Sequence, residues 1–152
     1  MSAPLDRLEE LGLELPEVAA PLAAYVPAVR AGDLVFTSGQ LPLRGGELLA
    51  TGKVGAEVDP EQAAACAQQC ALNALAAAAA LVPLDRVRRV VKLVVFVASA
   101  PGFTGQPGVG NGASHLIAEV FGDSGRHARS AVGVAVLPLD APVEVEAVFE
   151  VG

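Results

Sequence analysis

Aromatic and basic residues are scarce in this chain of 152 residues. Aromatic side chains make up 4% of it, with one tyrosine and no tryptophan, so few rings are available to stack on nucleic-acid bases. Acidic residues outnumber basic ones by 17 to 10, and the resulting formal net charge of −7 would repel a phosphate backbone. Both shortages argue against nucleic acid as a partner.

Cysteine is equally rare, and Cys66 and Cys70 are too few for the disulfide framework of a small secreted domain. Only His115 and His127 could join them around a zinc ion, so we expect no metal site and assign both thiols to helix packing. No apolar stretch approaches the ~20 residues that span a bilayer, and the acidic N-terminus does not resemble a signal peptide. These absences predict a cytoplasmic protein without a membrane partner.

Hydrophobic residues make up 53% of the chain against 18% charged, a balance typical of a globular protein. The length fits one domain. We expect an N-terminal extension at 1–20 and the domain proper at 21–152. The extension should form a short amphipathic helix before Pro16, because its leucines recur at helical spacing: they are Leu5, Leu8, Leu11 and Leu15.

Turn and cap signals divide the domain into strands and helices. Two β-rich pieces at 25–30 and 33–41 flank Gly32-Asp33, which predicts a hairpin. Asp59, Pro60 and Gln62 have the spacing of a helix start, and that helix should end near Val82, before Pro83. The other expected elements are a strand at 85–99, a helix at 112–121, and strands at 129–136 and 143–150.

This order, β-β-α-β-α-β-β, indicates an α+β fold in which one sheet carries both helices on one face. The first helix has no charge between Glu61 and Asp85, whereas a surface helix usually keeps a charged face. We therefore expect it to be covered on more than one side, which points to burial in an oligomer.

The segment 99–112 is rich in glycine and includes a G-x-G-x-x-A pattern from Gly108 to Ala113. A dinucleotide fold would need an acidic residue about 20 positions further on, where this chain has Gly133, and room for a nucleotide-binding half-domain. We interpret 99–112 as a flexible loop. The two histidines suggest no Ser-His-Asp triad, because the chain lacks a nucleophile-elbow pattern.

Arg129 is the most informative charged residue. On an alternating strand it shares its face with small residues, which would leave an open trough beside a guanidinium able to clasp a carboxylate; these residues are Ala131, Gly133 and Ala135. The alternative is a salt bridge at a strand end. Ser38, followed by Gly39 at the end of a strand, either lines a ligand cleft or simply ends the strand.

Glu144, Glu146 and Glu150 alternate with inward-facing apolar residues, which by default is an exposed polar face. If the last two strands formed a hairpin, Glu144 would lie about 20 Å along the strand from Arg129. The two could then share a pocket only through a second subunit. They could also meet if the strands were not hairpin partners.

Several segments, in this order, resemble the YjgF/Rid family, the reactive intermediate deaminases. They are YVPAV at 25–29, TSGQLP at 37–42, VVKLVVFV at 90–97, RSAV at 129–132, LPLD at 137–140 and VEVEA at 143–147. The resemblance implies a chorismate-mutase-like α+β fold with a mixed sheet. It also implies a homotrimer with ligand clefts between subunits.

By the same resemblance, Arg129 would hold a substrate carboxylate and Glu144 would position a water molecule. That water would hydrolyse a small enamine or imine carboxylate to a 2-keto acid and ammonia, without a cofactor. Tyr25, Ser38 and Asn111 match other cleft positions, and Ala131 would contribute its backbone N–H. Alternative functions are non-catalytic binding of carboxylate metabolites and, third, an endoribonuclease or translation inhibitor.

The chain also departs from the family pattern. Ala131 stands where deaminating members carry a cysteine, and Gly133 replaces a larger, often acidic residue. The segment 99–112 is long beside the family's compact loop. These departures indicate a divergent branch with a wider trough and a bulkier substrate.

Overall fold

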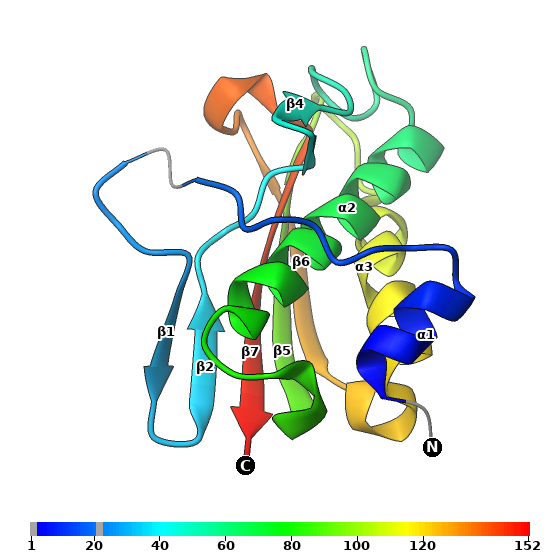
Figure 1. Ribbon diagram of the computed structural model, residues 1–152. Coiled ribbons are helices and arrows are strands. Elements are labelled where there is room, and N and C mark those ends of the chain that lie inside the picture. Colours follow the sequence, from blue (N-terminus) through cyan, green and yellow to red (C-terminus); the bar gives the residue numbers. More distant parts are fainter. Residues whose placement is uncertain (1–2, 21–22) are drawn as a thin grey trace.

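The computed structural model describes residues 3–20 and 23–152, and it confirms an α+β fold in which two long helices cover one face of a mixed sheet (Figure 1). The described helices are α1 (Pro4–Glu10), α2 (Pro60–Ala79) and α3 (Gln106–Phe121). The described strands are β1 (Ala28–Ala31), β2 (Leu34–Thr37), β3 (Leu43–Arg44), β4 (Glu47–Leu48), β5 (Val87–Ala98), β6 (Ala128–Val134) and β7 (Val143–Val151). None of the described helices is long and apolar enough to cross a membrane.

The main sheet has the strand order β1-β2-β7-β5-β6, while β3 and β4 form a separate small ribbon. The hairpin of β1 and β2 is confirmed, with Gly32 in its turn at a φ of +59°. In contrast, β6 and β7 are not hairpin partners. Both pair with β5, β6 in parallel and β7 antiparallel, so the long apolar β5 lies between them.

Helix α2 begins as predicted. The side chain of Asp59 accepts a 2.8 Å hydrogen bond from the backbone N–H of Gln62, and Pro60 occupies the first turn. The helix ends at Ala79, before Pro83. This agrees with the rule that a proline disfavours helical backbone at the residue before it.

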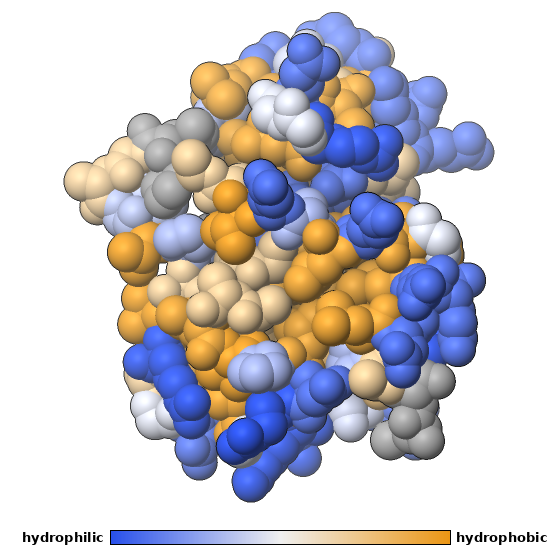
Figure 2. All heavy atoms as spheres, in the orientation of Figure 1, coloured by the Kyte–Doolittle hydropathy of each residue, from blue (hydrophilic) through white to orange (hydrophobic). Residues whose placement is uncertain are grey.

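Contacts within one chain explain why α2 has no charged residue between Glu61 and its end. The sheet and α3 cover two of its sides, and the segment after α1 crosses it (Figure 1), with Leu11, Leu13 and Leu15 packed against the core. Apolar residues gather in the middle of this face, over α2 and the N-terminal segment (Figure 2). The expectation that this helix is covered on more than one side is confirmed, and contacts within one chain supply that cover; burial in an oligomer stays a prediction.

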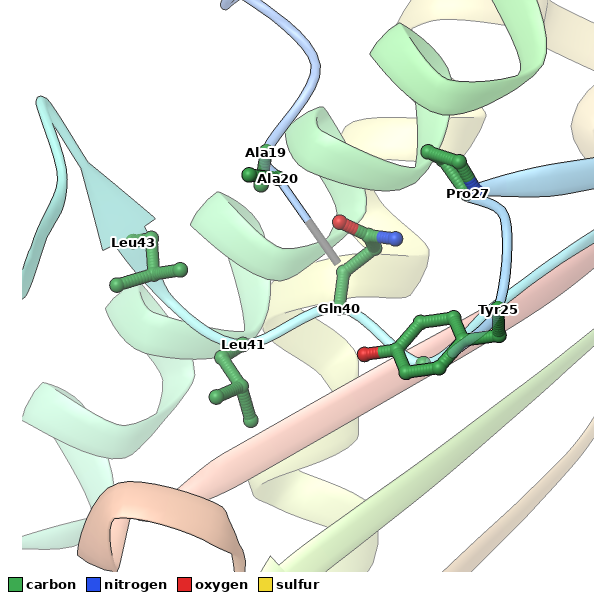
Figure 3. A pocket seen from close by; sticks show the side chains of 8 residues that line it. Ala19, Ala20, Tyr25, Pro27, Gln40, Leu41 and Leu43 are labelled. Carbon is green, nitrogen blue, oxygen red and sulfur yellow. The ribbon is translucent and has the colours of Figure 1, made fainter. Parts of the chain in front are cut away.

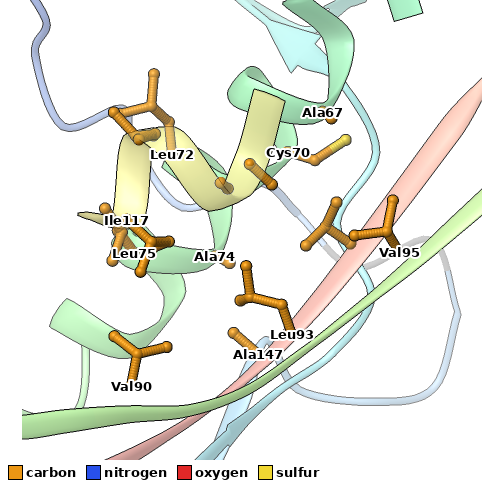
Figure 4. Packing of buried hydrophobic residues seen from close by; sticks show 14 of the residues in the cluster. Ala67, Cys70, Leu72, Ala74, Leu75, Val90, Leu93, Val95, Ile117 and Ala147 are labelled. Carbon is orange, nitrogen blue, oxygen red and sulfur yellow. The ribbon is translucent and has the colours of Figure 1, made fainter. Parts of the chain in front are cut away.

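The core lies between the helices and the sheet (Figure 4). Small residues of α2, such as Ala67, Cys70 and Ala74, bring the helix close to β7, and Leu93 and Val95 of β5 are fully buried in the same core. Removing this apolar surface from water is the main stabilising term, at roughly 25 cal/mol per Å².

The N-terminal helix is shorter than the leucine spacing predicts. It ends at Glu10, and Gly12 then takes a φ of +73°, which turns the chain so that the later leucines follow an extended path. Leu8 is buried in the same core as the sheet. The proposed boundary between 20 and 21 lies at residues 21–22, outside the described residues, so the division of the chain there stays a prediction.

The second half of the predicted glycine-rich loop at 99–112 is helical. Helix α3 begins at Gln106, with Pro107 in its first turn, so the glycines at 108, 110 and 112 are helical residues. A Cβ at Gly112 would lie 2.0 Å from the carbonyl oxygen of Ala64 on α2. Glycine is required there because the two helix backbones touch, and helix packing outweighs the low helix propensity of the segment.

This contact generates a prediction. Gly112→Ala should destabilise the protein by about 1–3 kcal/mol, because the new methyl group would force α2 and α3 apart. Gly108→Ala is the matched control, since its Cβ would meet nothing within 4 Å in the same helix, and it should stabilise by about 0.5–1 kcal/mol. Chemical denaturation of both variants measures this. Equal effects of the two substitutions would contradict the close helix contact.

Candidate functional site

The guanidinium of Arg129, on edge strand β6, points toward α3. Its Nη1 donates to Asn111 Oδ1 (2.9 Å) and to Ser114 Oγ (3.1 Å), and its Nη2 donates to the Pro107 carbonyl oxygen (3.1 Å). All three acceptors are neutral. No carboxylate pairs with Arg129 in the part of the chain that the structure describes, so the salt bridge considered for it does not form there.

Arg129 therefore keeps a positive charge and unused donors. A guanidinium has five N–H groups. The bonds just described use those of Nη1 and one of Nη2, which leaves the N–H of Nε and one of Nη2. Such donors can bind a carboxylate through charge-assisted hydrogen bonds.

The small residues after Arg129 lie beneath α3 rather than beside an open trough. A Cβ at Gly110 would lie 3.1 Å from Arg129 Nη1 and 3.5 Å from Ala131 Cβ. The helix backbone therefore packs on these positions, and the structure brings Arg129, Ala131 and Asn111 together as one group.

Gly133 does not widen the site. A Cβ there would lie 2.9 Å from Gln106 Nε2 and 3.1 Å from Ser99 Oγ. The Gln106 amide donates to Ser99 Oγ (3.1 Å) and to the Phe103 carbonyl oxygen (2.8 Å), which holds it in this space. The expectation of a wider trough is wrong because α3 begins earlier than predicted and fills it.

Sequence reasoning missed a serine and histidine beside Arg129. Ser114 Oγ lies 2.9 Å from His127 Nε2, and His127 Nδ1 lies 2.6 Å from the Gly125 carbonyl oxygen. The serine is on α3 and the histidine precedes β6, so no local motif connects them. Only the two-residue spacing of His127 and Arg129, which would put them on one face if the predicted strand began at the histidine, could have indicated the pairing.

A second group surrounds Glu144 at the start of β7. Its carboxylate lies against Gly39, where a Cβ would be 2.6 Å from Glu144 Oε2, so a larger residue at position 39 would displace this carboxylate. Ser38 Oγ donates a 2.6 Å hydrogen bond to the carbonyl oxygen of Val26, next to Tyr25. The structure thus brings Tyr25, Ser38 and Glu144 near the end of β2.

The environment of Glu144 favours its neutral form. Burial raises the pKa of this half-buried carboxyl above its ordinary value, and the negative charge of Glu146 raises it further. A carboxylate with a raised pKa is a better general base near neutral pH than an exposed glutamate.

A shallow recess adjoins this group (Figure 3). Gly39 separates it from Glu144, and the ring of Tyr25 lies across it. The volume open to the centre of a water molecule is about 30 Å³. The recess can therefore hold water but is too small for an amino-acid-sized ligand. Its lining residues are Ala19, Ala20, Tyr25, Pro27, Gly39, Gln40, Leu41 and Leu43.

The two groups do not meet within one chain. Arg129 pairs with Leu93 of β5, which faces the helices, whereas Glu144 pairs with Phe96, which faces the opposite side. Strand spacings place the two Cα atoms roughly 14 Å apart. Although β6 and β7 are not hairpin partners, their arrangement keeps Arg129 and Glu144 in separate groups within one chain.

No cluster of three or more potential metal ligands occurs among the described residues. Both cysteines are unpaired and buried on α2. Burial raises the pKa of Cys66 to about 11 and raises that of Cys70 as well, so neither thiol supplies the thiolate that a metal or a substrate would need.

Residues 5–150 match the family described as "YjgF/chorismate_mutase-like, putative endoribonuclease". Protein TCP17 of Trypanosoma cruzi is 51% identical over 145 residues, which are 94% of this chain and 91% of that protein. The crystal structure of a "putative endoribonuclease" from Shewanella oneidensis superposes with a TM-score of 0.95 at 35% identity, covering 99% of this chain and 100% of that one.

A more distant solved structure contains a ligand. It is TdcF of E. coli with bound serine, which is 26% identical, superposes with a TM-score of 0.66 and covers 90% of this chain and 94% of that one. The family match spans almost the whole sequence and agrees with the fold. This protein therefore belongs to the YjgF/chorismate-mutase-like family.

Proposed function

We propose that this protein hydrolyses small enamine or imine carboxylates to 2-keto acids and ammonia, without a cofactor, in clefts between copies of the chain. The observation that carries the proposal is the state of Arg129. Its guanidinium is held by three neutral acceptors, keeps its charge and retains N–H groups for a carboxylate. The serine bound to TdcF, a small molecule with a carboxylate, supports a ligand of this class.

The chemistry needs an oriented carboxylate and one activated water. Glu144, with its raised pKa, takes a proton from the water as the water oxygen adds to the imine carbon. The proton then passes to the nitrogen of the resulting carbinolamine. As the C–N bond breaks and ammonia leaves, the carbinolamine hydroxyl gives its proton to Glu144 and becomes the carbonyl group of a 2-keto acid. An iminium carbon is already electrophilic, so orientation supplies most of the required rate enhancement.

The sheet face opposite the helices supports assembly. Val29, Phe36 and Val132 lie on this face with exposed fractions of 53%, 43% and 44%. Large apolar side chains gathered on a sheet face mark an interaction surface. A ring of three copies, as the family resemblance implies, would cover this face and join the Arg129 group of one copy to the Glu144 group of the next.

A mixing experiment tests the shared cleft. Arg129→Ala and Glu144→Gln should each be inactive alone. After unfolding and refolding together in equal amounts, about a quarter of the clefts should contain both intact residues, and activity should recover toward that fraction. Ammonia release from an imine generated in situ measures the recovery. Absence of recovery in a mixed oligomer would show that each chain forms its own site.

The role of Arg129 can be tested by binding. Arg129→Ala should weaken binding of a 2-keto acid at least tenfold, because a charge-assisted hydrogen bond contributes about 1.5–3 kcal/mol. Arg126→Ala, at an exposed arginine nearby, is the control and should bind normally. Isothermal titration calorimetry compares them. Equal affinities for the two variants would remove Arg129 from the site.

The raised pKa of Glu144 predicts a pH dependence. Protonated Glu144 cannot accept a proton, so activity should fall as the pH drops through a pKa above the ordinary glutamate value. Glu146→Gln removes the repelling charge, lowers the pKa of Glu144 and should move this acidic limb to lower pH. Glu150→Gln, on the same strand face, should leave it in place. NMR titration of the Glu144 carboxyl carbon checks the assignment independently of turnover.

Binding without catalysis is the second candidate function, and Ala131 favours it because this chain lacks the thiol that deaminating relatives carry at the matching position. Ligand binding through Arg129 without ammonia release would select it. Endoribonuclease activity appears in the family description, but a net charge of −7 gives the chain little affinity for a phosphate backbone.

A further inference from the structure

A directed series of hydrogen bonds connects Arg129 to the turn before β6. The Gly125 carbonyl oxygen can only accept, so His127 Nδ1 carries the proton in this 2.6 Å contact. In a neutral imidazole, Nε2 then accepts the hydroxyl proton of Ser114 at 2.9 Å. Ser114 has donated its only proton, and it therefore presents a lone pair to Arg129 Nη1 at 3.1 Å.

The far end of this series is anchored by backbone packing. A Cβ at Gly125 would lie 2.6 Å from the carbonyl oxygen of Ile117 on α3, so the turn is pressed against the helix. His127 immediately precedes β6, two residues before Arg129, and both side chains reach Ser114. The series thus ties the guanidinium to two elements that cannot shift independently.

The acceptors on α3 form a stripe toward β6. Pro107, Asn111 and Ser114 are spaced at i, i+4 and i+7, so their acceptor atoms face Arg129 from one side of the helix. They occupy one part of the guanidinium and leave the N–H of Nε and one of Nη2. Holding a long side chain in one rotamer before binding removes part of the entropy cost of binding.

We propose that Ser114 and His127 are positioning residues, which preorganise Arg129 for a carboxylate by fixing the guanidinium through the Ser114 hydroxyl. The inference rests on the proposed function, since it concerns the affinity of that same site. A merely structural tether between α3 and β6 would instead affect the stability of the fold and leave the affinity of the folded protein unchanged.

The test uses a pair of variants with the same shape. Ser114→Thr keeps the hydroxyl, and Ser114→Val replaces it with a methyl group. We expect Ser114→Val to weaken pyruvate binding to the full-length protein about tenfold relative to Ser114→Thr. His127→Phe, which keeps the ring and loses both nitrogens, should weaken it about threefold. His115→Phe, at an exposed histidine of α3, is the control and should bind as the unmodified protein does.

The affinity of each variant is measured by calorimetry, and its melting temperature is measured alongside. The comparison separates loss of fold from loss of binding. Nitrogen NMR of the imidazole should show the Nδ1–H tautomer of His127 in the unmodified protein, and the Arg129 side-chain signals should broaden in Ser114→Val. Both spectra test the series even if a variant is less stable.

The outcomes are distinct. Weaker binding by Ser114→Val and His127→Phe, with Ser114→Thr retained, supports the inference. Normal pyruvate affinity in Ser114→Val, or the Nε2–H tautomer of His127, overturns it while the proposed function stands. If the unmodified protein binds neither pyruvate nor 2-oxobutanoate, the proposed function fails and the positioning role falls with it.

Discussion

Strand β5 lies between β6 and β7, and the arrangement of the site depends on this placement. Arg129 pairs with Leu93 of β5, and Glu144 pairs with Phe96, three residues further along the same strand. Side chains alternate between the two faces of a strand, so Arg129 faces the helices while Glu144 faces the opposite side of the sheet. Each chain therefore carries two separate groups of site residues. Under the proposed function, a cleft that contains both groups would form between neighbouring copies.

Close backbone packing around α3 is the second constraint. Gly112 lets α3 touch α2, while Gly110 leaves room for the Arg129 guanidinium. Gly133 on β6 leaves room for the Gln106 side chain. The first residue of α3 therefore fills the space that a larger residue at position 133 would occupy. Glycines that weaken the local helix propensity thus bring the Arg129 group together.

Local signals in the sequence predicted much of the fold correctly. The Asp59 cap, the Gly32-Asp33 turn and the β-branched run of β5 act within a few residues, and each is found where expected. The start of α3 was missed because helix-breaking glycines dominate its local pattern, while the contact with Ala64 that stabilises it comes from a distant helix. The Ser114–His127 pair was also missed, because it joins α3 to the segment before β6 and no local motif connects the two residues.

The sequence by itself determined the elements, the α+β class and the residues with the right chemistry, because hydrophobic periodicity, caps and turns are short-range properties. Tertiary structure decided which of those residues meet. Contacts between segments far apart in the chain place β5 between β6 and β7 and pack α3 closely on β6. Such contacts also bury Glu144 and so raise its pKa. Such contacts leave no periodic trace in the sequence.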